Sequence, residues 1–278
     1  MSKITVDVNC EVKLKFIIYY SKYKNELPFL GIIQIRKPLL LILDPEVGKD
    51  VMIRHFKSFH DNEFGKMVDP KIDPLVGKNP FLLRGDEWKE KRAEITPAFT
   101  SNRLKAVYPL IVEVQKQMTN YINNEINNPF DARELSAKFT TDVVSSCIYS
   151  ADAQSFTKEN PEIRAMGRKL MEPAGSFLFK MSLIEAFPFL GKIIKLQFVS
   201  KDVENFFVGL LNQALKYRDE HKIVREDFLD YLLMLKNKKN ISDLDIAAHT
   251  VTFFSDGFDT SSVAIAHTLY EVSLRIWA

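Results

Sequence analysis

Residues 242–275 read SDLDIAAHTVTFFSDGFDTSSVAIAHTLYEVSLR, and this stretch decides the fold. It predicts one long helix. Ser242 can cap the first free N–H groups, and Asp243 and Asp245 place negative charge in the first turn, where the helix dipole favours it. No proline interrupts the stretch. At 1.5 Å per residue the helix is on the order of 50 Å long, which is enough to cross a whole domain.

The middle of this helix carries groups that are costly to bury. Gly257 weakens a helix interior, and Asp256 and Asp259 need partners in a core. Residues 256, 259, 260 and 263 follow the i, i+3, i+4, i+7 spacing, which predicts one shared face. Thr260 can turn its hydroxyl onto the carbonyl of Asp256, and Gly257 lets another group approach the backbone.

Two interpretations of this middle turn stay open. The turn can hold a small diatomic molecule or a water and pass protons to it. It can also be part of a core helix whose polar groups are satisfied by neighbouring helices. Periodicity alone favours the core helix.

No membrane span is predicted. The helix over 242–275 is long and largely apolar, but four ionisable side chains argue against a span: His249, Asp256, Asp259 and His267. The first fifteen residues carry five charged side chains, a pattern of neither a secretory signal nor a membrane anchor.

Length and composition indicate a folded chain with a sizeable core. The sequence has 278 residues, of which 46% are hydrophobic and 27% charged, and this length permits one large domain or two small ones. A net charge of +2 gives no argument for a nucleic acid partner. Cys10 and Cys147 are the only cysteines, so no disulfide framework is expected and a reducing, intracellular environment is the default.

The rest of the chain predicts a mainly helical fold with a small N-terminal β element. Two apolar runs within 27–43 are separated near Pro38 and predict two strands. Asp44 and Pro45 predict the start of a helix that runs to about Phe56, and 58–84 has the composition of a long ordered loop. Apolar spacing predicts further helices over 104–125, 132–148, 161–171, 201–216 and 226–235.

A short helix is predicted between Asp86, as its N-cap, and Pro97, as its stop. Trp88 and Arg92 are four residues apart and therefore side by side on it. Both side chains are hydrogen-bond donors only, so together they suit a carboxylate held at the flank of the helix. The alternative is a stacked Trp–Arg pair on a surface, which is common.

Residues 176–199, SFLFKMSLIEAFPFLGKIIKLQFV, are aromatic and aliphatic throughout and are broken by Pro188 and Gly191. They can form a core segment. They can equally form an exposed apolar element that dips into a membrane surface or gates a pocket. The residues alone support the two interpretations equally.

Taken in order, these features resemble the cytochrome P-450 family of haem-thiolate monooxygenases, most closely its microsomal insect type. NPFLLRGDEWKEKRAEITPAFTSNRLK resembles the C-helix region of that family, and DARELSAKFTTDVVSSCIYSADAQSF its E-helix. REDFLDYLLML resembles the H-helix, and FFSDGFDTSS the oxygen-binding groove of the long central I-helix. The resemblance covers about residues 20–271. It implies one incomplete P-450 domain over 1–278, a partial fold that ends after the I-helix.

The resemblance also implies roles for six residues. Trp88 and Arg92 would donate hydrogen bonds to a haem propionate. Asp259 and Thr260 match the acid–alcohol pair that delivers protons during oxygen activation. Gly257 would keep the helix clear of the haem face, and Asp256 beside it would also belong to the cofactor-binding wall. Asp256 stands where the family usually has Ala or Gly.

By the same resemblance, the function is that of a haem-dependent monooxygenase active in xenobiotic metabolism. It would take electrons from an NADPH-dependent reductase and insert one atom of O2 into a lipophilic small molecule, at the cytoplasmic face of the endoplasmic reticulum membrane. Residues 176–199 would fall between the F- and G-helix regions, which favours contact with the membrane surface or gating.

The iron ligand of the family is a cysteine in a loop of the type FxxGxRxCxG. Neither Cys10 nor Cys147 has that context, so no metal ligand is assigned. The ExxR motif, the N-terminal anchor and the proline-rich hinge are not found either. We therefore expect the first half or so of a family member, inactive alone. The alternatives are a non-catalytic truncated product, a helical binding module with a lipophilic cavity, and an unrelated helical protein that matches these motifs by chance.

Overall fold

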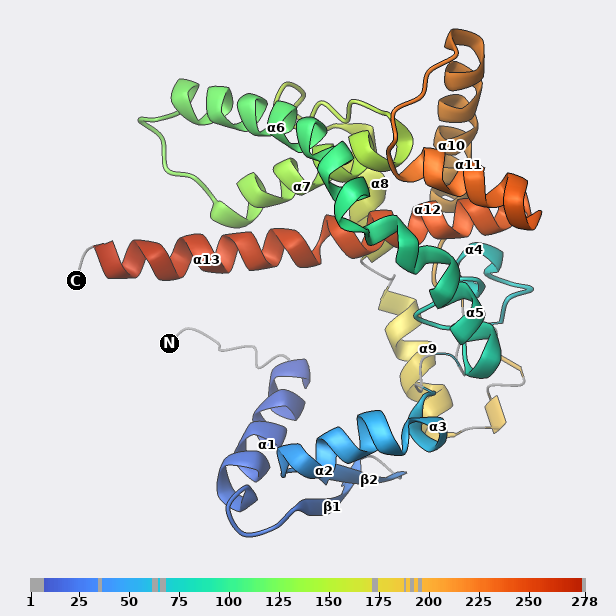
Figure 1. Cartoon of the computed structure of the whole chain (residues 1–278). Helices are drawn as coiled ribbons and strands as arrows, with labels where there is room; N and C mark the ends of the chain where they lie inside the picture. The colour runs from blue at the N-terminus through green and yellow to red at the C-terminus, as the bar shows by residue number, and fades with distance from the viewer. Residues whose placement is uncertain are drawn as a thin grey trace. The chain divides into compact units, whose positions relative to one another are not determined.

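The structure is a computed structural model that describes residues 8–34, 37–61, 65, 69–171, 175–187, 189–190, 193–194 and 197–276. The chain divides into two compact units. The first comprises residues 1–61 and 182–192, and the second comprises residues 62–181 and 193–278. The described residues are mostly helical with one two-stranded sheet, which confirms the predicted fold class (Figure 1).

The first unit contains the sheet. Its elements are α1 (Val8–Tyr23), β1 (Phe29–Gln34), β2 (Lys37–Ile42), α2 (Pro45–Lys49), the π-helical turn η1 (Asp50–Arg54) and α3 (Phe56–Phe59), and residues 182–186 of α9. The two predicted strands are present and antiparallel, with Phe29 opposite Ile42. The Asp44 carboxylate accepts the Glu46 N–H at 2.7 Å, so α2 begins as predicted. The predicted helix does not continue evenly to Phe56, because η1 interrupts it.

The second unit holds the helical core. Its elements are α4 (Pro74–Gly77), α5 (Gly85–Ile95), the 3-10 turn η3 (Thr96–Phe99), α6 (Ser101–Asn124), α7 (Ala132–Tyr149), α8 (Glu162–Met171), residues 175–181 of α9 (Gly175–Ala186), α10 (Lys201–His221), α11 (Phe228–Lys239), α12 (Asp243–Phe258) and α13 (Thr260–Ile276). The helices predicted over 104–125, 132–148, 161–171, 201–216 and 226–235 are α6, α7, α8, α10 and α11. Of the predicted loop 58–84, residues 62–64 and 66–68 lie outside the described residues, and α4 forms in the remainder.

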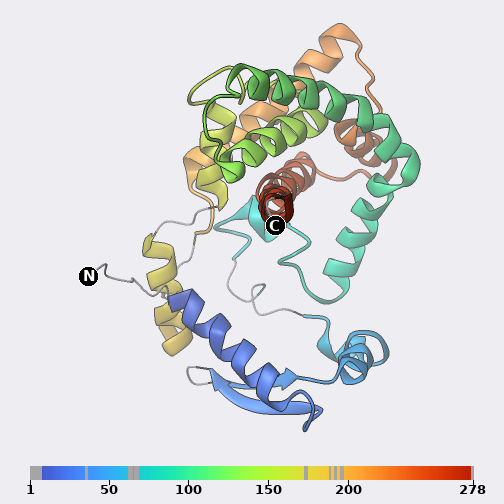
Figure 2. The same ribbon diagram turned by 90° about the vertical axis from the view of Figure 1, so that its left-hand side faces the viewer.

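The long helix predicted over 242–275 starts as expected but is interrupted. Ser242 Oγ accepts the Asp245 N–H at 3.1 Å, and the Asp245 carboxylate accepts the Ser242 N–H at 3.1 Å, which makes a reciprocal capping box. α12 ends at Phe258 and α13 begins at Thr260, so Asp259 lies between two helices rather than inside one. The two helices follow one another in nearly the same direction (Figure 1), and Figure 2 looks along α13.

The boundaries of α5 differ from the prediction. Arg84, not Asp86, is the N-cap, and Asp86 lies in the first turn, where its charge still favours the helix dipole. Gly85 has a φ of 57°, a left-handed conformation that favours glycine. Pro97 does not stop the helical path. It lies in η3, where the missing N–H of a proline near the start of a turn costs nothing.

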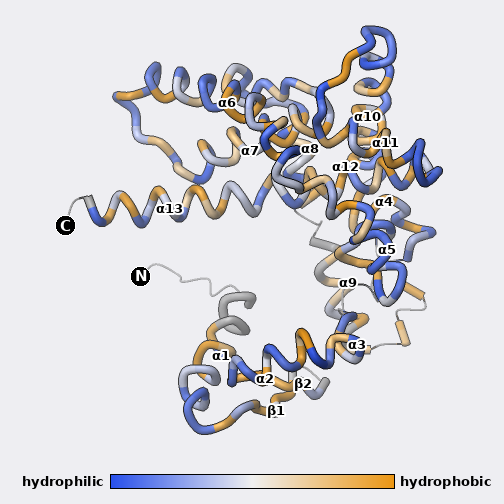
Figure 3. The backbone as a smooth tube through the Cα atoms, in the orientation of Figure 1, coloured by the Kyte–Doolittle hydropathy of each residue, from blue (hydrophilic) through white to orange (hydrophobic). Residues whose placement is uncertain are grey.

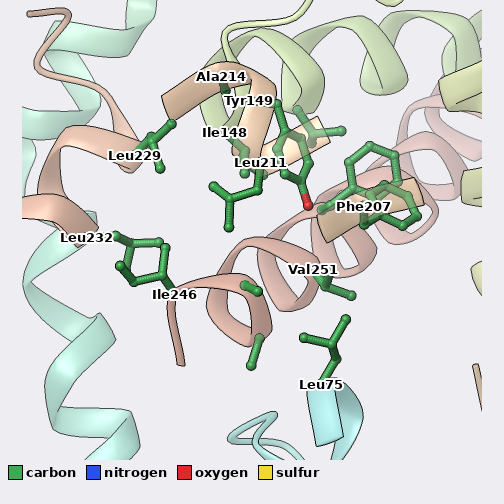
Figure 4. Packing of buried hydrophobic residues seen from close by; sticks show 14 of the residues in the cluster. Leu75, Ile148, Tyr149, Phe207, Leu211, Ala214, Leu229, Leu232, Ile246 and Val251 are labelled. Carbon is green, nitrogen blue, oxygen red and sulfur yellow. The ribbon is translucent and has the colours of Figure 1, made fainter. Parts of the chain in front are cut away.

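The core of the second unit is built around α12. The rings of Phe207 in α10 and Phe254 in α12 have centroids 4.8 Å apart, and the ring centroid of Tyr149 in α7 lies 6.1 Å from that of Phe254. Figure 4 shows part of this cluster, including Tyr149 and Phe207. Ten residues of α12 are buried. At Gly167 of α8, an added Cβ would come within 2.7 Å of the Phe258 ring, so a glycine there allows α8 to pack closely against α12.

The segment predicted as either core or exposed contains both kinds of side chain. Phe177 is buried and its ring lies 4.3 Å from that of Phe198, whereas Phe179, Phe189 and Ile193 are exposed. Pro188 and Gly191 lie outside the described residues. Among the helices of the described residues, none combines the length and the apolar character that a membrane crossing requires.

Candidate functional site

An apolar cavity of about 370 Å³ lies in the second unit, beside the last turns of α5 and α12. Its apolar walls come from α5, η3, α6, α7 and α12 and include Ile95, Phe99, Val107, Val144, Ile148 and Phe253. Three of the six predicted site residues line it: Arg92, Asp256 and Gly257. The fold therefore brings residues from two distant parts of the sequence to one cavity.

α5 places Arg92 at this cavity because the residue lies in the last turn of that helix. Its side chain is largely exposed, so the guanidinium can present its donors at the edge of an apolar space. Trp88 lies one turn earlier on the same helix and is half-buried, and it is not among the residues that line the cavity. The predicted i, i+4 relation of the two side chains holds along α5, while only Arg92 reaches the cavity wall.

The Asp256 side chain lies at the cavity wall, where one part of it contacts apolar residues and another part contacts solvent. Burial against the cavity walls raises the pKa of its carboxyl group, and the positive charge of Arg92 partly offsets that effect. Because the side chain also reaches water, the group can exchange protons with solvent. An acid of this kind next to a guanidinium gives one end of the cavity a polar character.

Gly257 has a packing role in the structure. A Cβ at this position would come within 2.6 Å of Val144 Cγ1, so the missing side chain lets α12 approach α7. Gly257 also lines the cavity. The role predicted from the resemblance, clearance of a haem face, stays a prediction beside this structural reason.

Three hydroxyl groups donate to backbone carbonyls at the interruption between α12 and α13. Ser262 Oγ donates to the carbonyl of Asp259 at 2.7 Å, and the other two belong to Thr260 and Thr140. Thr260 Oγ1 donates to the carbonyl of Asp256, as predicted from the spacing. Thr140 Oγ1, from α7, donates to the carbonyl of Phe258 at 2.8 Å. Since carbonyls at a helix end lack intrahelical partners, the bonds from Thr260 and Thr140 stabilise the interrupted turn. The sequence carries no signal for the role of Thr140, because its partner lies on a different helix.

Asp259 faces a different hollow from Asp256. Its carboxylate pairs with the guanidinium of Arg133 on α7, and both side chains are partly exposed. This second hollow has a volume of about 250 Å³ and is also lined by Arg164 and Arg168. The prediction that Asp256 and Asp259 share one face is wrong, because the helix is interrupted at Asp259 and the ion pair holds its side chain towards α7.

Cys147 on α7 lines the apolar cavity and packs against the core, as predicted for a small apolar residue. Burial is the main cause that raises the pKa of its thiol to about 11. The thiol is therefore protonated at neutral pH and is a poor nucleophile and a poor metal ligand in this environment.

The residues at the cavity suit an apolar group with an acidic edge. The walls supply apolar contacts, and Arg92 offers charged donors at the rim. This combination fits a haem whose propionates meet Arg92. The lining also includes a second guanidinium, that of Arg103, and the carboxylates of Glu226 and Asp227, so the fit depends on the propionates lying at Arg92.

Comparisons with known proteins agree with this architecture. The family model for cytochrome P450 matches residues 10–275. Probable cytochrome P450 28d1 of Drosophila melanogaster is 36% identical over 256 residues, which cover 90% of this chain and 51% of that protein. Cytochrome P450 6A1 of Musca domestica is 33% identical over 264 residues, covering 92% and 51% of the two chains.

A third relative, cytochrome P450 6k1 of Blattella germanica, is 31% identical over 283 residues, covering 93% of this chain and 53% of that protein. The chain thus spans about half the length of the curated relatives it matches. The family model covers nearly the whole chain, including the α5 motif, the interrupted helix and the cavity between them. The chain therefore belongs to the cytochrome P450 family.

Proposed function

We propose that this chain serves a haem-dependent monooxygenase and supplies part of its haem pocket. The observation that carries the proposal is the shared cavity of Arg92, Asp256 and Gly257. These residues belong to the two motifs that resemble the haem-edge and oxygen-binding regions of the family, and the fold places them around one apolar space. We further propose that both units belong to one P450 domain, since the family match continues across them.

Arg92 would hold the acidic edge of the haem, with Trp88 one turn earlier as a second donor on the same helix. Haem, when bound, supplies the iron centre at which O2 is activated for insertion of one oxygen atom. The apolar walls would exclude water from the haem ring, while Arg92 at the exposed rim would meet a propionate through charge-assisted hydrogen bonds.

Asp259 and Thr260 would deliver protons at the interrupted turn. The Asp259 carboxylate is partly exposed and therefore in contact with water, and Arg133 fixes its position. The Thr260 hydroxyl is held on the carbonyl of Asp256 and can rotate to accept and donate in turn. Asp256, whose pKa is raised by burial, adds a second proton-holding group on the cavity side.

The electron source, the substrate and the cellular location follow from the same proposal. The apolar walls of the cavity support a lipophilic small molecule as the substrate class, as expected in xenobiotic metabolism. The relatives are insect cytochromes P450. On the resemblance to the microsomal insect type we propose an NADPH-dependent reductase as the electron donor and the cytoplasmic face of the endoplasmic reticulum membrane as the location. The exposed aromatic residues Phe179 and Phe189 support contact with the membrane surface.

Titration of the chain with haemin tests the proposal. We expect a Soret shift on binding, and an Arg92→Gln variant should bind roughly ten- to hundred-fold more weakly, since a hydrogen bond to a charged group contributes roughly 1.5–3 kcal/mol. Lys89→Gln is the matched control, because Lys89 is an exposed cation on the same helix and does not line the cavity. Equal affinities for wild type and Arg92→Gln would contradict the proposed haem edge.

The apolar cavity also favours a second candidate, a non-catalytic helical module that binds lipophilic molecules. It predicts saturable binding of an apolar probe such as 1-anilinonaphthalene-8-sulfonate that haemin does not displace. Displacement of the probe by haemin, with lower potency for Arg92→Gln, supports the monooxygenase instead.

A further inference from the structure

A pair of buried ionisable side chains joins α5 to α12 near the cavity. Glu94 of α5 is 3% exposed and His249 of α12 is 1% exposed. His249 Nε2 lies 3.5 Å from Glu94 Oε2, and neither ring nitrogen of His249 has a hydrogen-bond partner among the described residues. A buried imidazole without partners is costly, so its presence in the core needs a physical reason.

Other charged groups surround the Glu94–His249 pair. Lys91 Nζ lies 3.0 Å from the carboxylate of Glu94 and 3.3 Å from that of Asp245. Two further ammonium groups approach these carboxylates, Lys78 at 2.9 Å from Asp245 and Lys239 at 3.9 Å from Glu94. The Tyr231 hydroxyl, which is neutral, donates to the backbone carbonyl of Glu94. The cluster therefore holds three ammonium groups against two carboxylates.

This arrangement disfavours a charged imidazole. Burial is the main cause that lowers the pKa of His249, and Lys91 lowers it further, while Glu94 and Asp245 act in the opposite direction. A proton on His249 would add a second uncompensated positive charge to the cluster. In the intact fold His249 is therefore neutral at neutral pH, and taking up a proton would weaken the contact between the two helices.

The pair lies on the same two helices that build the cavity. Glu94 follows Arg92 by two residues on α5, and His249 precedes Asp256 by seven residues on α12, which places these two on one face of that helix. Any movement of the last turn of α5 away from α12 would therefore also move Arg92 away from Asp256.

We propose that Glu94 and His249 are positioning residues for Arg92. With His249 neutral, its contact with Glu94 holds the last turn of α5 against α12, and protonation of His249 loosens that turn and releases Arg92 from its place at the cavity. The inference rests on the proposed function only in naming Arg92 as the haem-edge residue. The contact between the helices and its response to pH are properties of the haem-free chain.

Trp88 lies on α5 and reports on this contact without any cofactor. In the haem-free chain carrying Trp277→Phe, which removes the only other tryptophan, the emission of Trp88 should shift as the pH falls from 8 to 5. The shift should begin below about pH 6.5, the ordinary imidazole value, because the loosened state binds the proton more readily than the intact one. In His249→Gln the shift should be largely lost.

His267→Gln is the matched control, since His267 is an exposed histidine on α13 and its replacement should leave the shift unchanged. A second measurement keeps the test valid should His249→Gln fail to fold. Amide hydrogen exchange of the wild-type chain, corrected for the intrinsic effect of pH, should speed up in α5 at pH 5 while that of α11 stays protected. No emission shift in the wild type, the same shift in His249→Gln, or unchanged exchange in α5 would overturn the inference.

Haemin titrations at pH 8 and pH 5 separate this inference from the proposed function. An emission shift without haemin binding would support the positioning pair and contradict the proposed haem pocket. Haemin binding without an emission shift would support the haem pocket and contradict the positioning pair. Where both hold, haemin affinity should fall at pH 5 in the wild type and fall much less in His249→Gln.

Discussion

α12 and α13 follow one another in sequence and are both rich in apolar residues, yet their surroundings are opposite (Figure 3). Ten of the sixteen residues of α12 are buried, whereas Leu269, Tyr270, Val272 and Leu274 of α13 are all more than 40% exposed. α12 packs against α4, α7, α8, α10 and α11, while the main contacts of α13 in the described residues are with α7 and α12. Apolar sequence makes a helix available for burial, and neighbouring elements determine whether it is buried.

The largest expected difference between the two helices is in the cost of removing an apolar side chain. Phe254→Ala in α12 should lower the free energy of unfolding by about 3–5 kcal/mol, because the ring is fully buried and its loss leaves a cavity. Leu274→Ala in α13 should change it by less than about 0.5 kcal/mol, since this side chain is half exposed. Urea unfolding followed by circular dichroism measures both. Equal losses would show that α13 is buried in solution.

The next largest loss of stability is expected where α12 packs closely against α7. Gly257→Ala should cost about 1–3 kcal/mol, because the new Cβ would lie 2.6 Å from Val144 Cγ1. Gly209→Ala in α10 is the control. No heavy atom lies within 4 Å of a Cβ there, so the substitution should stabilise the chain by roughly 0.5–1 kcal/mol.

Adding Val144→Ala to Gly257→Ala tests the assigned cause. The double variant should recover part of the stability lost by Gly257→Ala, because the clashing methyl group is removed. An additive loss in the same urea experiment would mean that Gly257 is required for another reason.

At the junction of the two helices, the ion pair between Asp259 and Arg133 should contribute less to the free energy of unfolding than these packing contacts do. Asp259→Asn should lower stability by about 0.2–1 kcal/mol, the range of partly exposed pairs, and added salt should reduce the difference. Arg133→Gln should have the same effect, and the double variant should cost little more than either single one. A double-variant cycle that shows no coupling would exclude the pair as a stabilising contact.

The smallest change in stability is expected at Asp256, where the substitution should stabilise the chain rather than destabilise it. Burial raises the pKa of this carboxyl group in the folded chain above its ordinary value of 3.8, so the folded chain binds the proton more readily than the unfolded one. The charged carboxylate therefore lowers the stability of the folded chain slightly at neutral pH. This loss of stability disappears as the pH falls through the raised pKa of Asp256. Asp256→Asn should be slightly more stable than wild type at pH 7, with a smaller difference at pH 4.5, as measured by urea midpoints. A less stable variant at pH 7 would reverse this assignment.

Local features of the fold could be predicted from sequence because their causes are local. Ser242 and Asp245 form the capping box within one turn, and Asp44 begins α2 through its own neighbour. Two apolar runs predicted the strands, and the hydroxyl bond from Thr260 to the carbonyl four residues back followed from helical spacing.

The remaining features depend on partners that are distant in sequence. The interruption at Asp259 and its pairing with Arg133 involve two helices, and periodicity within one helix predicted a shared face instead. The pair of Glu94 and His249 is equally non-local, since nothing in the sequence of either helix pairs the two residues. Arg92 was identified from its motif, but only the fold shows that it reaches the cavity while Trp88 on the same helix does not line it.

The aromatic contacts of α12 also constrain the order in which the chain can fold during synthesis. Phe254 packs against Tyr149 and Phe207, which leave the ribosome much earlier. Until α12 has been translated, the rings of Tyr149 and Phe207 can contact each other, with centroids 6.0 Å apart, but they lack Phe254 as their shared partner. The contacts that offset the entropic cost of closing these long loops are therefore incomplete until then. We therefore expect the nascent chain to remain aggregation-prone and open to chaperone binding until α12 emerges, with core formation as a late step.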